Sequence, residues 1–211
     1  MKVELVPTIL TQTFAEFKAK MEKLDDYFDL VQIDCADGEF VKNKTFYDID
    51  KIKSLIFNAD LELHLMVTNP LKEIKKWQNY KKVKTIIFHY EAVINDKKIL
   101  GIINYLKKCK IKAGLAVNPE TKFEKFKKFL PILDLVLVLG VKPGWGGQKF
   151  QSKVLNKIKQ IRQSFPQIDI EVDGGVNFDN AKEIIMAGAN ILAVGSMFKD
   201  LRNIKKLEKL I

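Results

Sequence analysis

Three polar residues stand near the ends of short apolar runs that otherwise have the composition of buried strands. They are Asp34 in Val-Gln-Ile-Asp, His64 in Glu-Leu-His-Leu-Met and Asp173 in Glu-Val-Asp-Gly-Gly. Burying carboxylates is costly unless something pairs with their charge. Two carboxylates and an imidazole form an oxygen and nitrogen ligand set that suits a divalent cation such as zinc, iron(II) or manganese. If the three side chains meet, the sequence predicts a metal site.

Side-chain alternation along a strand places further polar residues on the same faces as this cluster. The pairs that share a face are Gln32 with Asp34, Glu62 with His64, and Glu171 with Asp173. Their sequence neighbours are apolar and suit a face covered by helices, so we expect the polar set to point into a barrel. Glu62 and Glu171 would then lie one layer below the cluster. We expect Lys112, on the fifth apolar run, to neutralise that layer.

Glycine-rich turns follow the last three apolar runs. They contain Gly144, Trp145, Gly146 and Gly147, then Gly174 and Gly175, then Gly195 and Ser196. Glycine lets backbone N–H groups come close to an anion, and phosphate-binding TIM barrels often use the loops after strands seven and eight. This arrangement favours a phosphate site, although tight turns without a ligand would also use glycine. No turn matches a dinucleotide fingerprint, so we expect no nucleotide cofactor.

Eight short runs rich in β-branched residues alternate with segments of helical periodicity along the chain. The expected strands are Val3–Ile9, Leu30–Cys35, Leu61–Val67, Lys84–His89, Ile111–Val117, Leu133–Leu139, Ile168–Val172 and Ile191–Val194. Helix start signals stand at Thr13, at Asn69-Pro70 and at Asn118-Pro119-Glu120, and Ile49, Ile52, Leu55 and Ile56 step at helical spacing. A closing helix is expected from Met197 to Ile211.

Eight β-α units in 211 residues predict an α/β fold, a (β/α)8 TIM barrel in which residues 1–211 form a single domain. A doubly wound open sheet is the alternative. In a barrel the active site lies at the C-terminal ends of the strands, which is where the polar residues stand.

Composition excludes several other classes of protein. The formal net charge is +10, but nearly all the cations are lysines scattered over expected helix faces, so we expect no nucleic-acid binding. No apolar stretch approaches the about 18 residues of a membrane span, and the N-terminus has no signal-peptide pattern. The two cysteines, Cys35 and Cys109, indicate a reduced, cytoplasmic protein without disulfides.

Six motifs occur in the order and spacing of one known family. They are Pro7-Thr8-Ile9-Leu10, the run from Asp34 to Val41, His64-Leu65-Met66, the run from Pro143 to Gln148, the run from Glu171 to Val176, and Val194-Gly195-Ser196. Their order and spacing agree along essentially the whole chain, which resembles the ribulose-phosphate 3-epimerases. The resemblance implies an isomerase of the racemase and epimerase class. Such an enzyme interconverts D-ribulose 5-phosphate and D-xylulose 5-phosphate in the pentose phosphate pathway.

The resemblance also implies residue roles and partners. Asp34 and Asp173 would be the two catalytic carboxylates, and both would bind one divalent metal ion (Zn²⁺, Fe²⁺, Mn²⁺ or Co²⁺) with His64. The substrate, a small phosphorylated ketose, and chiefly its phosphate, would contact Thr8, His64, Gly144, Trp145, Gly146, Gly147, Gly174, Gly175, Gly195 and Ser196. The protein would associate as a homo-oligomer without nucleic-acid or membrane partners.

The chain departs from the family pattern at the site itself. Gln32 replaces a metal-binding histidine, and an amide oxygen is a weaker ligand than imidazole for zinc-like metals. Other family residues, two methionines and a serine, appear here as Ala36, Leu139 and Gly140. Two alternatives therefore stay open: a 3-epimerase of another ketose phosphate, or a phosphosugar-binding relative without catalysis. The related orotidine-phosphate decarboxylase type is disfavoured because Asp34-Cys35-Ala36-Asp37 lacks the lysine of its Asp-x-Lys-x-x-Asp motif.

Overall fold

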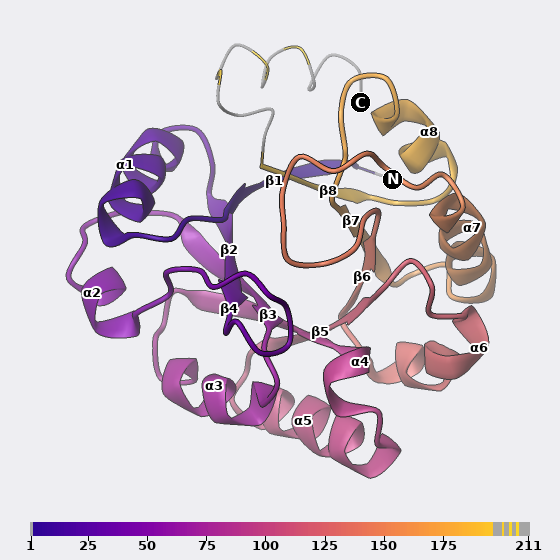
Figure 1. The fold of residues 1–211 in the computed structure, drawn as a ribbon. Helices are drawn as coiled ribbons and strands as arrows, with labels where there is room; N and C mark the ends of the chain where they lie inside the picture. Colours follow the sequence, from indigo (N-terminus) through magenta and orange to yellow (C-terminus); the bar gives the residue numbers. More distant parts are fainter. Residues whose placement is uncertain (1, 196–199, 201–202, 204–205, 207–211) are drawn as a thin grey trace.

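The computed structural model describes residues 2–195 together with 200, 203 and 206. Eight parallel strands form a closed barrel in sequence order, as Figure 1 shows along the barrel axis. The strands are β1 (Glu4–Ile9), β2 (Leu30–Ala36), β3 (Asp60–Met66), β4 (Val83–His89), β5 (Lys112–Val117), β6 (Leu135–Leu139), β7 (Asp169–Asp173) and β8 (Ile191–Val194). The predicted TIM barrel is confirmed, and each strand begins and ends within two residues of its predicted bounds.

Helices cover the outside of the barrel (Figure 1). They are α1 (Phe14–Asp25), α2 (Ile49–Lys53), α3 (Pro70–Trp77), α4 (Tyr90–Val93), α5 (Asp96–Lys108), α6 (Phe123–Phe126), the 3-10 helix η1 (Lys127–Ile132), α7 (Val154–Ser164) and α8 (Ala181–Met186). Two predicted start signals are confirmed. Thr13 caps α1 in a capping box with Glu16, and Asn69 caps α3 with Pro70 in the first turn.

Two helix predictions are wrong. Asn118-Pro119-Glu120 does not start a helix, because Thr121 N–H donates to the Asn118 carbonyl in a turn and α6 begins only at Phe123. The second helix ends at Lys53, and Ile56 is fully exposed although it continues the helical spacing. Ser196 and most of the expected helix from Met197 to Ile211 lie outside the described residues. No helix in the described ranges is long and apolar enough to cross a membrane.

The buried apolar side chains form two main layers and a small third cluster of Ala36, Val41 and Met66. The larger lies between strands and helices and includes Ile33, Leu63 and Val172. The smaller fills the barrel interior and consists of Val6, Ile87, Ala116, Leu135, Leu137, Leu139 and Ile191. Because side chains alternate, the outward position of Ile33, Leu63 and Val172 turns their polar neighbours inward, as predicted.

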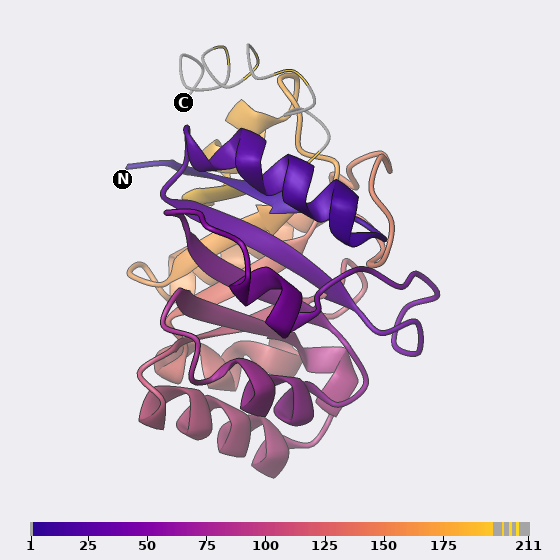
Figure 2. The same cartoon turned by 90° about the vertical axis from the view of Figure 1, so that its left-hand side faces the viewer.

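Strand register and loop position together define the functional end of the barrel. Asp34 on β2 lies directly beside His64 on β3, and Asp173 pairs with Leu139 on β6 and Ala193 on β8. The loop after β2 and the loop after β6 project from the same end of the barrel (Figure 2). The polar residues therefore lie at the C-terminal end of the strands, under these two loops.

Below the cluster, Glu62 and Glu171 are buried in the barrel interior. Neither carboxylate oxygen of Glu171 has a hydrogen-bond partner among the described residues. Burial raises the pKa of Glu62 to about 7, and burial together with the charge of Glu62 raises the pKa of Glu171 well above its ordinary value. Both carboxyl groups therefore hold protons at mildly acidic pH, and protonation removes the negative charge of this layer.

Lys112 is not the partner that we expected for this layer. It occupies the first position of β5, where it is exposed, and among the described residues neither Glu171 oxygen nor Glu62 Oε1 has a hydrogen-bond partner. Its charge does lower the pKa of Glu62, but from a solvent-screened position. Lys112 does not pair with these glutamates because the lower end of the barrel is open to water at this residue.

The raised pKa values of Glu62 and Glu171 predict that stability declines as the pH rises. Below the ordinary glutamate pKa of 4.5, both carboxyls are protonated whether the chain is folded or unfolded. As pH rises toward 7, the unfolded chain ionises while the folded barrel holds its protons, so the free energy of unfolding falls. We expect Glu171→Gln to flatten this decline and to be more stable than the parent by roughly 1–3 kcal/mol at about pH 8.

Urea unfolding of the metal-free protein between about pH 5 and about pH 8 measures this effect. Lys112→Met serves as the comparison, and we expect it to change the slope much less. Equal slopes in Glu171→Gln and the parent, with a large loss in Lys112→Met, would show that Lys112 neutralises the layer after all.

Candidate metal and substrate site

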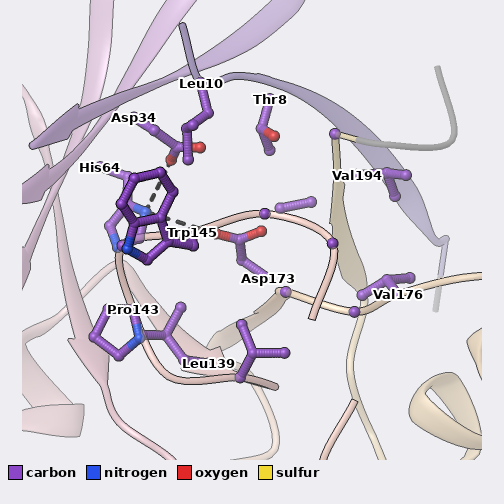
Figure 3. Close-up of a pocket in the computed structure, with 18 of the residues that line it drawn as sticks. Thr8, Leu10, Asp34, His64, Leu139, Pro143, Trp145, Asp173, Val176 and Val194 are labelled. Carbon is purple, nitrogen blue, oxygen red and sulfur yellow. Dashed lines mark hydrogen bonds and ion pairs between the residues drawn. The ribbon is translucent and has the colours of Figure 1, made fainter. Parts of the chain in front are cut away.

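Asp34, His64 and Asp173 meet at the C-terminal ends of β2, β3 and β7 (Figure 3). One potential ligand atom from each lies within 4.8 Å of the others. His64 Nδ1 lies 3.0 Å from Asp34 Oδ1 and 3.6 Å from Asp173 Oδ2. Asp34 and His64 are buried, whereas the Asp173 side chain is 17% exposed toward the cavity. The structure thus brings together the three residues that the sequence predicted would meet.

The electrostatics of this cluster favour bound protons or a bound cation. Burial, with the nearby charge of Asp34, raises the pKa of Asp173 to about 7, although His64 and Gln32 act in the opposite direction. Burial lowers the pKa of His64, but its hydrogen bond with Asp34 and the charges of both aspartates outweigh burial and raise the pKa overall. A metal ion can bind only as these protons leave, so its affinity is expected to rise with pH through neutrality.

Gln32 lies fully buried beside the cluster. Its Nε2 donates a hydrogen bond of 2.9 Å to Asp34 Oδ1, while its Oε1 has no partner among the described residues. A buried acceptor without a donor costs free energy, so this oxygen is available to a cation. Three converging ligand atoms and an orphaned amide oxygen fit a hard or borderline divalent ion, held by Asp34, His64 and Asp173 with Gln32 in reach.

His89 belongs to the site although the sequence reasoning did not select it. The chain has only two histidines, and His64 Nε2 lies 2.9 Å from His89 Nε2. Burial lowers the pKa of His89 to about 4, despite its contact with Glu91, so His89 is neutral. Its place at the C-terminal end of β4, on the inward face with Thr85, was a signal that could have identified it.

A cavity of about 560 Å³ opens above the cluster, and the glycine turns line it. Thr8 on β1 points into it (Figure 3). Any side chain at Gly195 would collide with Thr8, because a Cβ there would lie 2.6 Å from Thr8 Oγ1. Gly174 has φ +93°, which favours glycine, and a Cβ there would lie 2.4 Å from Val141. Bare backbone therefore lines the part of the cavity nearest β7 and β8.

The loops after β2 and β6 are joined above the cavity. Asn43 is buried, and its Nδ2 donates a hydrogen bond of 2.7 Å to the Gly144 carbonyl. Trp145 follows at the cavity rim with 54% of its surface exposed, and Gly146 and Gly147 also line the opening. The structure thus places every predicted substrate contact at one cavity, apart from Ser196, which lies outside the described residues.

Two nearby residues have structural roles. The Asp37 carboxylate accepts hydrogen bonds from Glu39 N–H and Phe40 N–H and from the backbone and hydroxyl of Thr68, which together lower its pKa despite burial. Cys35 is completely buried, and burial raises the pKa of its thiol well above the ordinary value. Neither is placed to react in the cavity.

Sequence comparison identifies the relatives of this chain. A sequence model of the Ribulose-phosphate 3 epimerase family matches residues 4–199. Ribulose-phosphate 3-epimerase of Chlamydia muridarum is 37% identical, with 84% of this chain and 80% of the relative aligned. The Buchnera aphidicola and Bacillus subtilis proteins of the same name are 34% and 33% identical, with 94% and 92% of this chain and 89% and 91% of each relative aligned.

Solved structures with the same fold are much more distant in sequence. Orotidine 5'-monophosphate decarboxylase from Sulfolobus solfataricus has a TM-score of 0.65 at 12% identity, covering 100% of this chain and 99% of that chain. A mutant tryptophan synthase α-subunit from Pyrococcus furiosus has a TM-score of 0.69 at 13% identity, covering 93% and 89%. These two structures establish the TIM-barrel fold alone. The family model and the curated relatives show more, namely that this chain belongs to the ribulose-phosphate 3-epimerase family.

Proposed function

We propose that this chain, acting as one domain over residues 1–211, interconverts D-ribulose 5-phosphate and D-xylulose 5-phosphate. The observation that carries the proposal is the pair of carboxylates, Asp34 and Asp173, on either side of His64 Nδ1 at the floor of the cavity. Family membership supports the same reaction, because the curated relatives are named for it.

The reaction inverts carbon C3, which lies beside the C2 carbonyl. One carboxylate removes the C3 proton, and a second returns a proton from the opposite face. Burial raises the pKa of Asp173 to about 7, so this residue can hold a proton near neutral pH and donate it. Asp34, on the other side of His64, then serves as the base. In the reverse direction the two aspartates exchange roles, and no redox cofactor is needed.

Asp34, His64 and Asp173 would hold one divalent ion (Zn²⁺, Fe²⁺, Mn²⁺ or Co²⁺), with Gln32 offering its amide oxygen. Such an ion supplies Lewis-acid stabilisation of the negative charge that develops on the substrate oxygens. Three of these side chains orient one another, since His64 and Gln32 both hydrogen-bond to Asp34. The sugar is thereby confined between two fixed carboxylates.

The phosphate of the ketose would bind where the cavity is lined by bare backbone. Gly174, Gly175 and Gly195 lie there with Thr8, and Ser196 follows directly in the chain. Turns of this kind present N–H groups to an anion, and the net charge of +10 attracts one from a distance. The loop from Gly144 to Gly147, with Trp145, would cover the substrate from the β6 side.

Gln32 is the observation that favours the second candidate, a relative that binds phosphosugars without epimerising them. An amide oxygen binds zinc-like metals more weakly than imidazole, so a metal-poor site would lose rate before it lost affinity for sugar. A protein that binds D-ribulose 5-phosphate but leaves its C3 hydrogen in place would support this alternative. Epimerisation of a different ketose phosphate would instead mean that the substrate assignment is wrong and the two-carboxylate mechanism is right.

Removing either carboxylate is expected to stop the reaction without unfolding the barrel. Asp34→Asn and Asp173→Asn should each lower kcat by about 10²–10⁴-fold, because each deletes a proton-transfer group. Coupled-enzyme detection of D-xylulose 5-phosphate measures the rate. Asp179→Asn, which removes an exposed carboxylate from the loop after β7, is the matched control and should keep normal activity. Near-normal kcat in either cluster variant would contradict the two-carboxylate mechanism.

Restoring a histidine at position 32 is expected to tighten metal binding. Gln32→His replaces an amide oxygen by an imidazole beside Asp34, and we expect the Kd for Zn²⁺ to fall by about 10-fold or more. Competition with a chromogenic chelator measures Kd. Gln163→His adds the same side chain on the exposed face of α7 and controls for a non-specific histidine site. An unchanged Kd in Gln32→His would mean that position 32 does not face the ion.

A further inference from the structure

The loop after β6, residues 140–150, is a braced unit that is joined to the barrel at its base. There, Gln151 N–H donates a hydrogen bond of 2.8 Å to the Gly140 carbonyl. Within the loop, the Gln148 side chain donates to the carbonyls of Lys142 and Trp145, at 2.7 and 2.8 Å. Such a unit keeps its own shape even if it swings on its base, so its position over the cavity depends on a further contact.

Asn43, on the loop after β2, supplies that contact. Its Nδ2 donates to the Gly144 carbonyl at 2.7 Å, and its Oδ1 accepts from Gln12 Nε2 at 3.3 Å. Among the described residues, the bond to Gly144 is the only hydrogen bond between residues 142–148 and another loop of the barrel. Asn43 is 1% exposed, so water competes little for this bond.

Gly144 has the conformation that this contact needs. Its φ is +112°, and a Cβ at this position would lie 3.0 Å from the Cβ of Val41. Both features favour glycine, because a side chain here would be strained and would press on the loop after β2. The backbone of the β6 loop therefore lies directly against the loop that carries Asn43.

The loop after β2 is in turn fixed to the strand that carries Asp34. Thr45 Oγ1 accepts a hydrogen bond from Ala36 N–H at 2.8 Å and donates one of 2.6 Å to the Asp34 carbonyl. Thr45 N–H also donates to the Ala36 carbonyl at 3.1 Å. Asn43 stands two residues before Thr45, so its amide is held at a set height above the end of β2.

We propose that Asn43 is a positioning residue that sets the spacing between the β6 loop and the two carboxylates, and thereby the room left for the sugar. The inference rests on the proposed function in taking the β6 loop as the cover of a ketose phosphate. Through Thr45 and Asn43, the backbone of Asp34 is tied to the Gly144 carbonyl. The floor and the cover of the cavity thus keep one spacing, which holds a bound substrate in one pose.

Substitution of Asn43 is expected to weaken substrate binding more than catalysis. In Asn43→Ala the KM for D-ribulose 5-phosphate should rise by about 3–10-fold, the effect of losing one hydrogen bond, with a smaller fall in kcat. Asn43→Asp keeps the size of the side chain but sets a carboxylate against the Gly144 carbonyl. If the hydrogen bond matters rather than the packing, its KM should rise at least as much.

Two controls separate the loop from the rest of the protein. The Kd for Zn²⁺ should not change in Asn43→Ala, because the bonds of Asn43 run to Gln12 and Gly144 and not to the metal cluster. Asn58→Ala removes an exposed asparagine from the segment before β3, at the opposite end of the barrel, and should leave KM unchanged. A changed Zn²⁺ affinity in Asn43→Ala would contradict a role confined to the loop.

Trp145 reports the position of the loop without substrate or metal. The chain has two tryptophans, and Trp77 is 1% exposed, so acrylamide quenches mainly the fluorescence of Trp145, which is 54% exposed. We expect a larger quenching constant in Asn43→Ala than in the parent or in Asn58→Ala. Gln12→Ala, at an exposed position that tolerates substitution, should shift KM and quenching in the same direction by less, because Asn43 loses the donor to its Oδ1.

An unchanged KM or an unchanged quenching constant in folded Asn43→Ala overturns the positioning role. If neither Asn43 variant folds, Gln12→Ala decides, and parent values of both quantities in that variant overturn it. Absence of epimerase activity in the parent, together with increased quenching in the variants, would overturn the proposed function and leave the link between Asn43 and the β6 loop standing.

Discussion

Negative charge buried in the mouth and interior of the barrel is the constraint on which the rest of this structure depends. Asp34 and Asp173 share a small space with the single imidazole of His64, and Glu62 and Glu171 lie below them. Carboxylates so placed cannot all remain ionised without a compensating positive charge. The raised pKa values of Glu62, Glu171 and Asp173 are the consequence in the metal-free protein.

The two layers resolve this constraint in different ways. In the lower layer Glu62 and Glu171 are buried, and their raised pKa values keep protons on these carboxyl groups at mildly acidic pH. The upper layer opens to the cavity, so its protons can be exchanged for a cation or for the protons of a substrate. Buried negative charge would destabilise a sealed core. In the upper layer the same buried charge raises the carboxyl pKa toward neutrality, which suits proton transfer. Gln32 donates a hydrogen bond to Asp34 in the upper layer, and its neutral amide stabilises this carboxylate without adding charge.

Much of the fold and the central cluster could be predicted from the sequence. Strand periodicity located all eight strands, and two-residue alternation placed Gln32, Asp34, Glu62, His64, Glu171 and Asp173 inside the barrel. Short local signals were less reliable. Asn118-Pro119-Glu120 has the composition of a helix start, but Asn118 N–H donates to Glu91 in α4. Ile56 continues the helical spacing after α2 has ended at Lys53. A tertiary contact accounts for the first case, whereas Ile56 is fully exposed.

What could not be predicted was how side chains pair across strands. The sequence shows His89 at the end of β4, but only the closed barrel brings its Nε2 to His64 and its Nδ1 to Glu91. Likewise, side-chain alternation along β5 predicts that Lys112 points into the barrel, as a partner of buried carboxylates would. Only the structure shows that Lys112 lies at the open lower end of the barrel, where water screens its charge. Periodicity gives the face that a side chain occupies, whereas height along the barrel axis depends on register and strand tilt.

The most direct measurement of the central claim supplies D-ribulose 5-phosphate in deuterium oxide to metal-stripped protein, before and after zinc, iron(II), manganese or cobalt is restored. We predict that the restored protein forms D-xylulose 5-phosphate with one solvent deuterium at C3, because buried carboxylates exchange protons with solvent between turnovers. A folded, metal-loaded protein that leaves the C3 hydrogen of the sugar in place with every metal would contradict it.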